Sequence, residues 1–203
     1  MIVIVDYGVG NLSSVSNMLR KAGGEVCVSH DPAEILSADK LLLPGVGHFD
    51  HGMKMLNGSG LREAIDRYAL ELKRPVLGIC LGAQILGKGS EEGVTPGLGW
   101  IDMFCHRFEA MPGIRVPHMG WNQIVQRKPS PLLDEMGEDA RFYFVHSYRM
   151  QCADPGDVLA TATHGVEFTC AVQRGNIFGT QFHPEKSLRH GLALMKAFVE
   201  FRP

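Results

Sequence analysis

The sequence lacks the features that mark membrane proteins, secreted disulfide-rich proteins and nucleic-acid-binding proteins. None of its apolar runs approaches the roughly 20 residues that a membrane-spanning helix needs. Its five cysteines are odd in number and widely spaced without a Cys-x-x-Cys pair, which disfavours a disulfide framework or a zinc site. The formal net charge of −2 gives no reason to expect nucleic acid or an anionic membrane as a partner. We therefore expect a cytoplasmic protein that binds no metal, cofactor, nucleic acid or membrane.

The composition that remains is that of an ordinary globular domain. Of the 203 residues, 45% are apolar and 21% are charged. A chain of this length can bury a substantial core as a single unit. We therefore expect one domain over residues 1–203.

The hydrophobic pattern predicts strands that alternate with helices. Apolar runs predict early strands at 1–5, 25–29, 40–43 and 75–79, and helical spacing predicts helices at about 12–22 and 61–72. Later strands are predicted at 141–148, 158–163, 168–173 and 176–182, followed by a C-terminal helix whose inner stripe is Leu192, Met195 and Val199. Residues 98–125, with β-like pieces at 99–102 and 122–125, are interpreted as irregular structure on the rim of the sheet. This order favours an α/β fold with a mainly parallel central sheet and flanking helices.

One cysteine lies in a stretch typical of a strand–nucleophile–helix elbow. Gly78 and Gly82 flank Cys80 at two residues on each side, between an apolar strand and a plausible helix. This spacing suits a sharp turn like the Gly-x-Ser-x-Gly elbow of hydrolases. A thiol at the start of a helix faces orphan N–H groups that favour the thiolate. On this stretch alone, a buried core cysteine between packing glycines is the alternative.

A histidine and a carboxylate follow about a hundred residues downstream. His183 ends an apolar segment, and Glu185 lies two positions later. Cys, His and Glu can act as a nucleophile, its base and the group that orients the base. Pro184 fixes one φ angle and so helps to aim both side chains from one turn. A surface histidine or a hydrogen-bonded structural histidine is the alternative for His183 considered by itself.

These two stretches together resemble the class I, or triad, glutamine amidotransferases. That family carries its nucleophilic cysteine in a Gly-x-Cys-x-Gly elbow and a His-Pro-Glu sequence near the C-terminus. The resemblance implies a flavodoxin-like fold and a triad of Cys80, His183 and Glu185 that hydrolyses glutamine to glutamate and ammonia.

The resemblance also implies the surroundings of the triad. The oxyanion would be bound by Leu81 and by a loop amide of Gly45 or Val46, although a plain glycine turn is the alternative for that loop. The substrate-binding residues implied are Gly47, Gln84, Glu92, His146, Ser147 and Tyr148. A solvated helix position for Gln84 and a surface charge for Glu92 are the alternatives.

Four further stretches narrow the resemblance to one group within this family. They lie at 6–11, 117–122, 142–148 and 183–187. Together they are similar to the glutaminase subunits of imidazole glycerol phosphate synthases, of histidine biosynthesis, over essentially the whole chain. Ala83 departs from the methionine common in that group. The resemblance implies that ammonia passes to a cyclase subunit of barrel fold, which makes imidazole glycerol phosphate and an aminoimidazole carboxamide ribotide. The interface residues implied are Asn11, Trp121 and Lys186, with a core position as the alternative for Trp121.

Three other classes of protein remain as hypotheses. They are a glutaminase of a different synthase, a cysteine peptidase or chaperone of related fold, and a catalytically inactive binding subunit. An intact Cys80, His183 and Glu185 is unexpected in an inactive subunit.

Overall fold

Strands and helices alternate from the first residues to the cysteine elbow, as the apolar pattern predicts. The computed structural model describes residues 1–137 and 139–202. The elements up to the elbow are β1 (Ile2–Val5), α1 (Leu12–Lys21), β2 (Val26–Ser29), α2 (Pro32–Ser37), β3 (Lys40–Gly45), α3 (Phe49–Gly58), α4 (Arg62–Asp66) with a π-helical turn at Arg67–Glu71, β4 (Val76–Cys80) and α5 (Leu81–Gln84).

The chain after the elbow is mostly strand. Its elements are β5 (Gly89–Ser90), β6 (Met103–Arg107), β7 (His118–Gln123), β8 (Val125–Gln126), β9 (Arg141–His146), β10 (Tyr148–Cys152), β11 (Val158–His164), β12 (Val166–Arg174), β13 (Ile177–Thr180) and α6 (Leu188–Glu200), with 3-10 turns at Pro155–Asp157 and Pro184–Lys186. Within the described ranges, no helix is long and apolar enough to cross a membrane.

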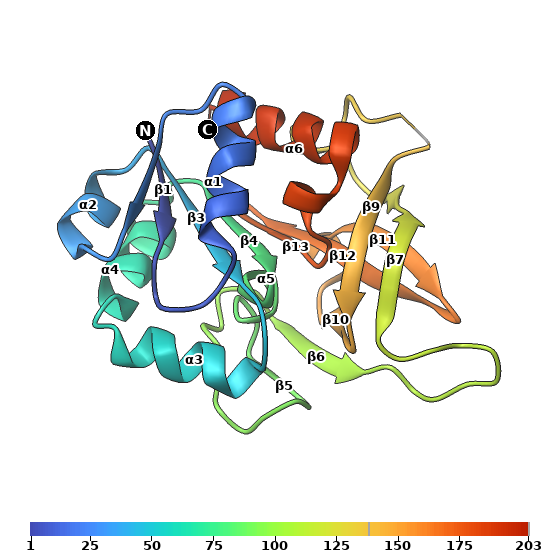
Figure 1. Cartoon of the computed structure of the whole chain (residues 1–203). Helices are drawn as coiled ribbons and strands as arrows, with labels where there is room; N and C mark the ends of the chain where they lie inside the picture. The colour runs from blue at the N-terminus through green and yellow to red at the C-terminus, as the bar shows by residue number, and fades with distance from the viewer. Residues whose placement is uncertain (138, 203) are drawn as a thin grey trace.

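A central sheet in the order β2-β1-β3-β4-β13-β12-β10-β6-β5 organises the molecule (Figure 1). The five strands from β2 to β13 run parallel, which confirms the α/β prediction. Beyond β13 the strands pair antiparallel as far as β6, β5 pairs parallel with β6 at the far edge, and β7 with β9 forms a separate two-stranded sheet. Because parallel strands end at the same edge, β3 and β4 bring Gly45 opposite Cys80.

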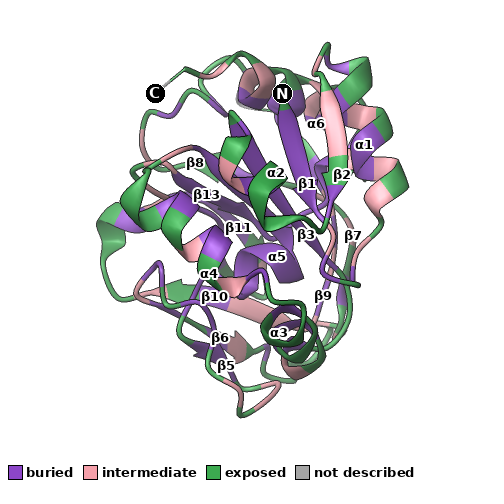
Figure 2. Cartoon of the chain, turned by 90° about the vertical axis from the view of Figure 1, so that its left-hand side faces the viewer, coloured by how far each residue is buried: buried purple, intermediate pink, exposed green. Residues whose placement is uncertain are grey.

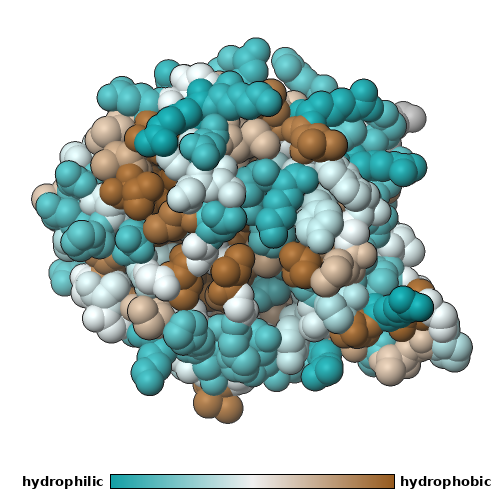
Figure 3. Space-filling model, in the orientation of Figure 1, coloured by the Kyte–Doolittle hydropathy of each residue, from teal (hydrophilic) through white to brown (hydrophobic). Residues whose placement is uncertain are grey.

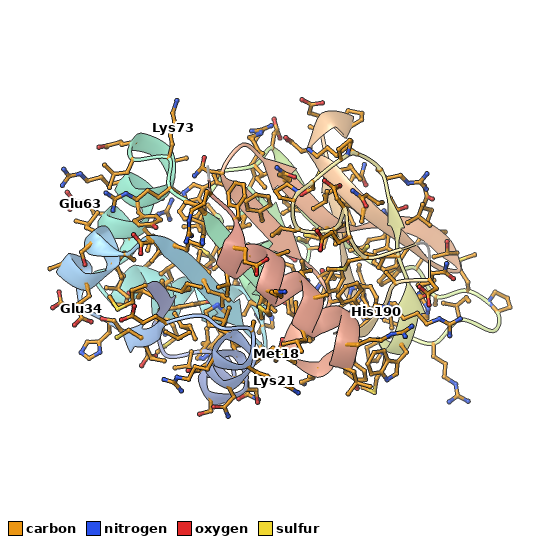
Figure 4. The ribbon with its side chains drawn as sticks, turned by 90° about the horizontal axis from the view of Figure 1, so that it is seen from above. Met18, Lys21, Glu34, Glu63, Lys73 and His190 are labelled. Atoms are coloured by element: carbon orange, nitrogen blue, oxygen red, sulfur yellow. The ribbon has the colours of Figure 1, made fainter. Side chains whose placement is uncertain are left out.

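Apolar side chains fill both faces of the parallel strands. Val3, Leu41 and Leu43 pack with the residues of α2, α3 and α4 on one face. Ile4 and Leu42 point to the other face, where α1 and α6 cover them. Figure 2 shows buried strands between helices with exposed outer sides, and Figure 4 shows the helix that carries Met18 and Lys21 on the same side as α6. Burial on both faces explains why these strands read as continuous apolar runs.

The structure corrects several predicted elements. Helices α2 and α3 were not predicted, and residues 99–102 are not a strand: Gly99 has φ of 69°, outside the extended region, and the strand begins only at Met103. The predicted strand at 141–148 is broken at Ser147 into β9 and β10, which belong to different sheets.

The inner stripe of the C-terminal helix was also wrong in part. Met195 is buried as predicted, but its buried companions are Gly191, Leu194 and Phe198, and Leu192 and Val199 lie on the flanks of the stripe. Both sets have helical spacing, so periodicity alone does not choose between them.

Candidate active site

Cys80 lies at a strained backbone turn between β4 and α5. Its φ is 54° and its ψ is −111°, a conformation that L-residues seldom adopt. The two neighbouring glycines make this turn possible. A Cβ on Gly78 would lie 2.5 Å from the carbonyl oxygen of Gly82, and a Cβ on Gly82 would lie 1.9 Å from that of Leu43. Backbone therefore fills the space where side chains would be, as the elbow hypothesis requires.

His183 and Glu185 form a buried pair beside the elbow. Nδ1 of His183 lies 2.7 Å from Oε1 of Glu185, and each side chain is 2% exposed. The backbone N–H of His183 donates to the carbonyl of Tyr143, and the hydroxyl of Ser187 donates to the carbonyl of His183. Because a carboxylate only accepts, the Glu185 contact places a proton on Nδ1 of the imidazole. A surface position for His183 is thereby excluded.

The protonated form of His183 is stabilised by its neighbours. Burial lowers the pKa of His183, but the interactions with Cys80 and Glu185 outweigh burial and raise the pKa to about 9. Nε2 of His183 and Oε2 of Glu185 are buried without a hydrogen-bond partner among the described residues. Cys80 and His183 line the same cavity, so the arrangement can supply both a nucleophile and a proton donor.

A cavity of about 450 Å³ opens above Cys80, a volume suited to a small molecule. Its lining residues are Asn11, Val46, Gly47, Cys80, Leu81, Gln84, Glu92, Val145, His146, Tyr148, His183 and Lys186. Figure 3 shows apolar side chains in the middle of the face that Figure 1 presents, where β3 and β4 end. Most residues implied by the family resemblance therefore meet in one cavity.

The loop after β3 lies directly against the elbow. Val46 and Gly47 are exposed and line the cavity, whereas Gly45 is buried and a Cβ there would lie 2.7 Å from the backbone nitrogen of Gly82. The hydroxyl of Tyr7 donates to the carbonyl of Pro44 at 2.6 Å. Burial, and then the neighbouring Cys80, raise the pKa of Tyr7 above its ordinary value, so the phenol keeps the proton it donates. The loop is thus anchored at Pro44, and Val46 and Gly47 further along it are exposed.

Helix α3, which the sequence did not predict, positions Glu92. Oε2 of Glu92 accepts a hydrogen bond from the backbone N–H of Phe49 at 2.7 Å, at the N-terminus of α3. Asp50 accepts from the backbone N–H groups of Val94 and Thr95 and so holds the same loop. Glu92 is therefore a half-buried carboxylate fixed at the cavity wall, not a free surface charge.

Gln84 and a residue that sequence reasoning missed, Gln181, lie behind the nucleophile. Gln84 is 5% exposed, which excludes a solvated helix position. Its Nε2 donates to Oε1 of Gln181 at 3.0 Å, and Nε2 of Gln181 lies 3.8 Å from Sγ of Cys80. The one signal for Gln181 in the sequence was its place two residues before His183, at the end of β13. Ala83, beside Gln84, is completely buried and faces Gly179 of β13.

The segment from His146 to Tyr148 forms another part of the wall. His146 and Tyr148 line the cavity, whereas Ser147 lies outside the lining and its carbonyl accepts from the backbone N–H of Phe108. Burial is the main influence that lowers the pKa of His146 to about 3, and that of His118 to about 4. Their rings are joined by a 2.9 Å contact between Nδ1 of His118 and Nε2 of His146. Both imidazoles are therefore neutral, and His118 is a second polar residue that sequence reasoning missed.

Comparison with known proteins decides between the classes of cysteine enzyme that this geometry permits. The family model for glutamine amidotransferase class-I matches residues 3–200. This chain belongs to the class I glutamine amidotransferase family.

Relatives within the family match the chain over its whole length. Imidazole glycerol phosphate synthase subunit HisH 2 of Pseudomonas aeruginosa is 52% identical over 200 residues, which cover 98% of this chain and 99% of that protein. Imidazole glycerol phosphate synthase subunit HisH of Bdellovibrio bacteriovorus is 46% identical over 203 residues, which cover 98% and 100% of the two chains. A solved structure of a glutamine amidotransferase from Thermotoga maritima has a TM-score of 0.66 at 16% identity, covering 97% of this chain and 81% of its own. This structural likeness shows the amidotransferase fold.

Two of the three residues expected at a partner interface line the amidotransferase cavity, and the third, Trp121, lies on β7 outside that lining. Asn11 and Lys186 line the cavity, and Asn11 also caps α1 by accepting from the backbone N–H of Ser14. Trp121 is 48% exposed on β7, which excludes a core position. Its ring lies 6.2 Å from that of Tyr143, over which Nζ of Lys186 lies at 5.8 Å.

Proposed function

We propose that this chain is the glutaminase subunit of an imidazole glycerol phosphate synthase in histidine biosynthesis. The observation that carries the proposal is the 52% identity, over 98% of the chain, to the Pseudomonas aeruginosa subunit that bears this name. The cavity around Cys80, His183 and Glu185 supports it chemically. In this proposal residues 1–203 act as one amidotransferase domain, and the compartment is the cytoplasm, where the five free thiols stay reduced.

The reaction begins with the Cys80 thiolate. Its sulfur attacks the side-chain carbonyl carbon of glutamine, and the C–N bond breaks as His183 gives a proton to the leaving ammonia. Water, deprotonated by His183, then attacks the thioester, which releases glutamate and restores Cys80. Glu185 keeps the proton on Nδ1 of His183 and stabilises the imidazolium in both steps.

The negative oxygen of each tetrahedral intermediate needs donors. In the proposal these are the backbone N–H of Leu81, at the start of α5, and a loop amide of Gly45 or Val46. In measured oxyanion holes, each such donor stabilises the transition state by roughly 3 kcal/mol. The contact of Gly45 with the elbow and the exposure of Val46 support this role.

Substrate glutamine fills the cavity in this proposal. Glu92 binds its α-amino group through the carboxylate that also holds the N-terminus of α3. Gln84 fixes the wall behind the side-chain amide, and Gly47 closes the open side. His146 and Tyr148 contribute from the opposite wall, with Ser147 contributing through the backbone that connects them.

Ammonia must reach its acceptor before water protonates it. We propose that a cyclase subunit of barrel fold docks over the cavity mouth, against Asn11, Trp121 and Lys186, and takes up the ammonia there. The exposed Trp121 and the lining positions of Asn11 and Lys186 support this surface. The cyclase then uses ammonia to make imidazole glycerol phosphate and an aminoimidazole carboxamide ribotide.

Product formation from glutamine tests the proposal. The chain is mixed with a purified cyclase subunit and its ribotide substrate, and imidazole glycerol phosphate is measured with either glutamine or an ammonium salt. The wild type should support synthesis from both, and Cys80→Ala should support synthesis from the ammonium salt only. Equal use of glutamine by wild type and Cys80→Ala, or no glutamine-dependent synthesis at all, would contradict the proposal.

A glutamine-analogue chloroketone separates a glutaminase from the other cysteine proteins of this fold. It should alkylate Cys80 selectively, because only this cysteine lines the cavity described here. Burial raises the pKa of Cys152 to about 12 and raises those of Cys105 and Cys170 as well, which further protects these thiols. Uniform labelling of the five cysteines would argue against a glutamine pocket.

A further inference from the structure

The side chain of Gln181 is completely buried between the nucleophile and Gln84, although it has no part in the mechanism above. Its backbone N–H donates to the carbonyl of Cys170 at 2.8 Å, which fixes the residue at the end of β13. Its Nε2 lies 3.8 Å from Sγ of Cys80, within hydrogen-bond distance for sulfur. A buried amide that contacts a nucleophile in this way can change the reactivity of that nucleophile, because it can present either a hydrogen-bond donor or an acceptor to the sulfur.

A chain of hydrogen bonds determines which end of the Gln181 amide faces the sulfur. The carbonyl of Tyr148 only accepts, so the amide group of Gln84 that lies 3.5 Å from it must be the Nε2 donor. The same Nε2 lies 3.0 Å from Gln181, whose facing atom must therefore be the acceptor Oε1. Nε2 of Gln181 is then the atom left for Cys80.

Two neutral histidines hold the far end of this chain. Nδ1 of His146 lies 2.7 Å from the Tyr148 carbonyl and must carry a proton. Nε2 of His146 is then an acceptor, and Nδ1–H of His118 donates a hydrogen bond to it at 2.9 Å. Nδ2 of Asn122 lies 3.2 Å from Nε2 of His118, so the donors from Asn122 through the two histidines point toward the Tyr148 carbonyl, which also accepts from Gln84 on its other side. Reversing the Gln181 amide would place its Nε2 against the Gln84 donor, two donors facing each other.

We propose that Gln181 is a further catalytic residue, whose Nε2–H donates a hydrogen bond to the Cys80 thiolate. The proposal rests on the proposed function, because it assumes that Cys80 is the nucleophile. A negatively charged sulfur accepts a hydrogen bond more strongly than a thiol does, and a dry surrounding strengthens the difference. Gln181 therefore increases the thiolate fraction and aims Sγ, while His183 remains free to move protons. When the sulfur becomes a thioester, the bond weakens, so Gln181 favours return to the thiolate.

The pH dependence of Cys80 alkylation tests this role without glutamine or a cyclase. Iodoacetamide reacts with the thiolate, and peptide mass spectrometry reports the rate at Cys80 separately from the other cysteines. Gln181→Met keeps the length of the side chain and removes the N–H groups. A lost hydrogen bond to a charged group should shift the alkylation midpoint upward and lower the rate below the midpoint by about tenfold. Gln181→Glu, which brings a negative charge to the sulfur, should shift the alkylation midpoint further upward.

Gln173→Met on β12 is the matched control, because it makes the same chemical change where Oε1 has no hydrogen-bond partner among the described residues. Its midpoint should equal that of the wild type. An unchanged midpoint in folded Gln181→Met would overturn the proposal. A purely structural effect would lower thermal stability and leave the midpoint in place.

A measurement on the wild type keeps the test valid even where a substitution at this buried position prevents folding. The side-chain amide protons of Gln181, observed by NMR in the full chain labelled with nitrogen-15, should shift as Cys80 titrates. They should not shift over the same pH range in Cys80→Ala. Amide protons whose chemical shifts do not change when Cys80 ionises would overturn the role of Gln181. Failure of the proposed function would instead show as absent glutamine-dependent synthesis with a cyclase.

Discussion

Replacing Glu185 with glutamine removes one negative charge from the buried pair and keeps its shape. Oε1 of Glu185 lies 2.7 Å from Nδ1 of His183, and both side chains are 2% exposed, so solvent screens this interaction little. Burial opposes the charged imidazole, yet the pKa of His183 is raised to about 9 by Cys80 and Glu185. Since an opposite charge this close contributes about 1 to 3 pKa units, Glu185→Gln should lower the pKa of His183 by about that amount.

The same change should slow glutamine hydrolysis. One pKa unit corresponds to about 1.4 kcal/mol, so the imidazolium loses about 1.4 to 4 kcal/mol of stabilisation. The glutamine amide can also present an N–H to Nδ1 and so favour the wrong tautomer, and the analogous change in a serine protease triad lowers kcat about 10⁴-fold. We expect a decrease of about 10² to 10⁴ in glutamate release by the complex with the cyclase.

Two measurements check this prediction. NMR titration of the His183 ring gives its pKa, and a steady-state assay of the complex gives the rate of glutamate release. Glu63→Gln is the matched control, because Glu63 is exposed on α4, at the outer edge of the molecule in Figure 4, and does not line the cavity. A pKa that stays at about 9 in Glu185→Gln, or a rate equal to that of the control, would refute the role given to Glu185.

Three further outcomes follow from the same geometry. Gly82→Ala should lower the free energy of unfolding by about 3 kcal/mol or more, because its Cβ would lie 1.9 Å from the Leu43 carbonyl oxygen. Gly58→Ala at the end of α3, where a Cβ would meet nothing within 4 Å, should be neutral or stabilising, and equal urea melts for the two variants would contradict this. Acid should destabilise the fold, because His118 and His146 bind protons below pH 6.5 in the unfolded chain. In the folded chain they stay neutral down to pH values of about 4 and about 3. Each histidine then removes about 1.4 kcal/mol per pH unit in that window, and a flat urea-unfolding profile between pH 6.5 and pH 4 would show that the pair is not buried neutral. Gly47→Pro should abolish the stimulation of glutamate release by a liganded cyclase, because Gly47 has φ of 102°, which proline cannot adopt; undiminished stimulation would contradict a role for this loop in activation.

Sequence alone predicted the parts of the site whose functional residues lie within a few positions of one another in the chain. The two glycines around Cys80 and the turn that joins His183 to Glu185 are such cases, because the conformation required is confined to a few neighbouring residues. The parallel strands were likewise predictable, since burial on both faces demands continuous apolar runs.

The features that sequence reasoning missed depend on contacts between distant segments. Helix α3 contains Gly52, a poor helix former, because a Cβ there would lie 2.8 Å from Cδ2 of Leu81 in the elbow. Packing against a distant segment thus outweighs the low helix propensity of Gly52, so the residues of α3 alone do not predict the helix. Gln181 meets Gln84 across 97 positions of chain, and His118 meets His146 across 28, through the pairing of β13 with β4 and of β7 with β9. No local pattern encodes that register.

Glutamate release from glutamine, measured for the chain alone and with a purified cyclase subunit and its ribotide ligand, tests the central claim most directly. The claim predicts a negligible rate for the chain alone and a rate that rises by orders of magnitude in the mixture, with Cys80→Ala inactive in both. A substantial rate for the chain alone that the liganded cyclase leaves unchanged would contradict the assignment to histidine biosynthesis. The absence of glutamate release in both conditions would contradict glutaminase activity itself.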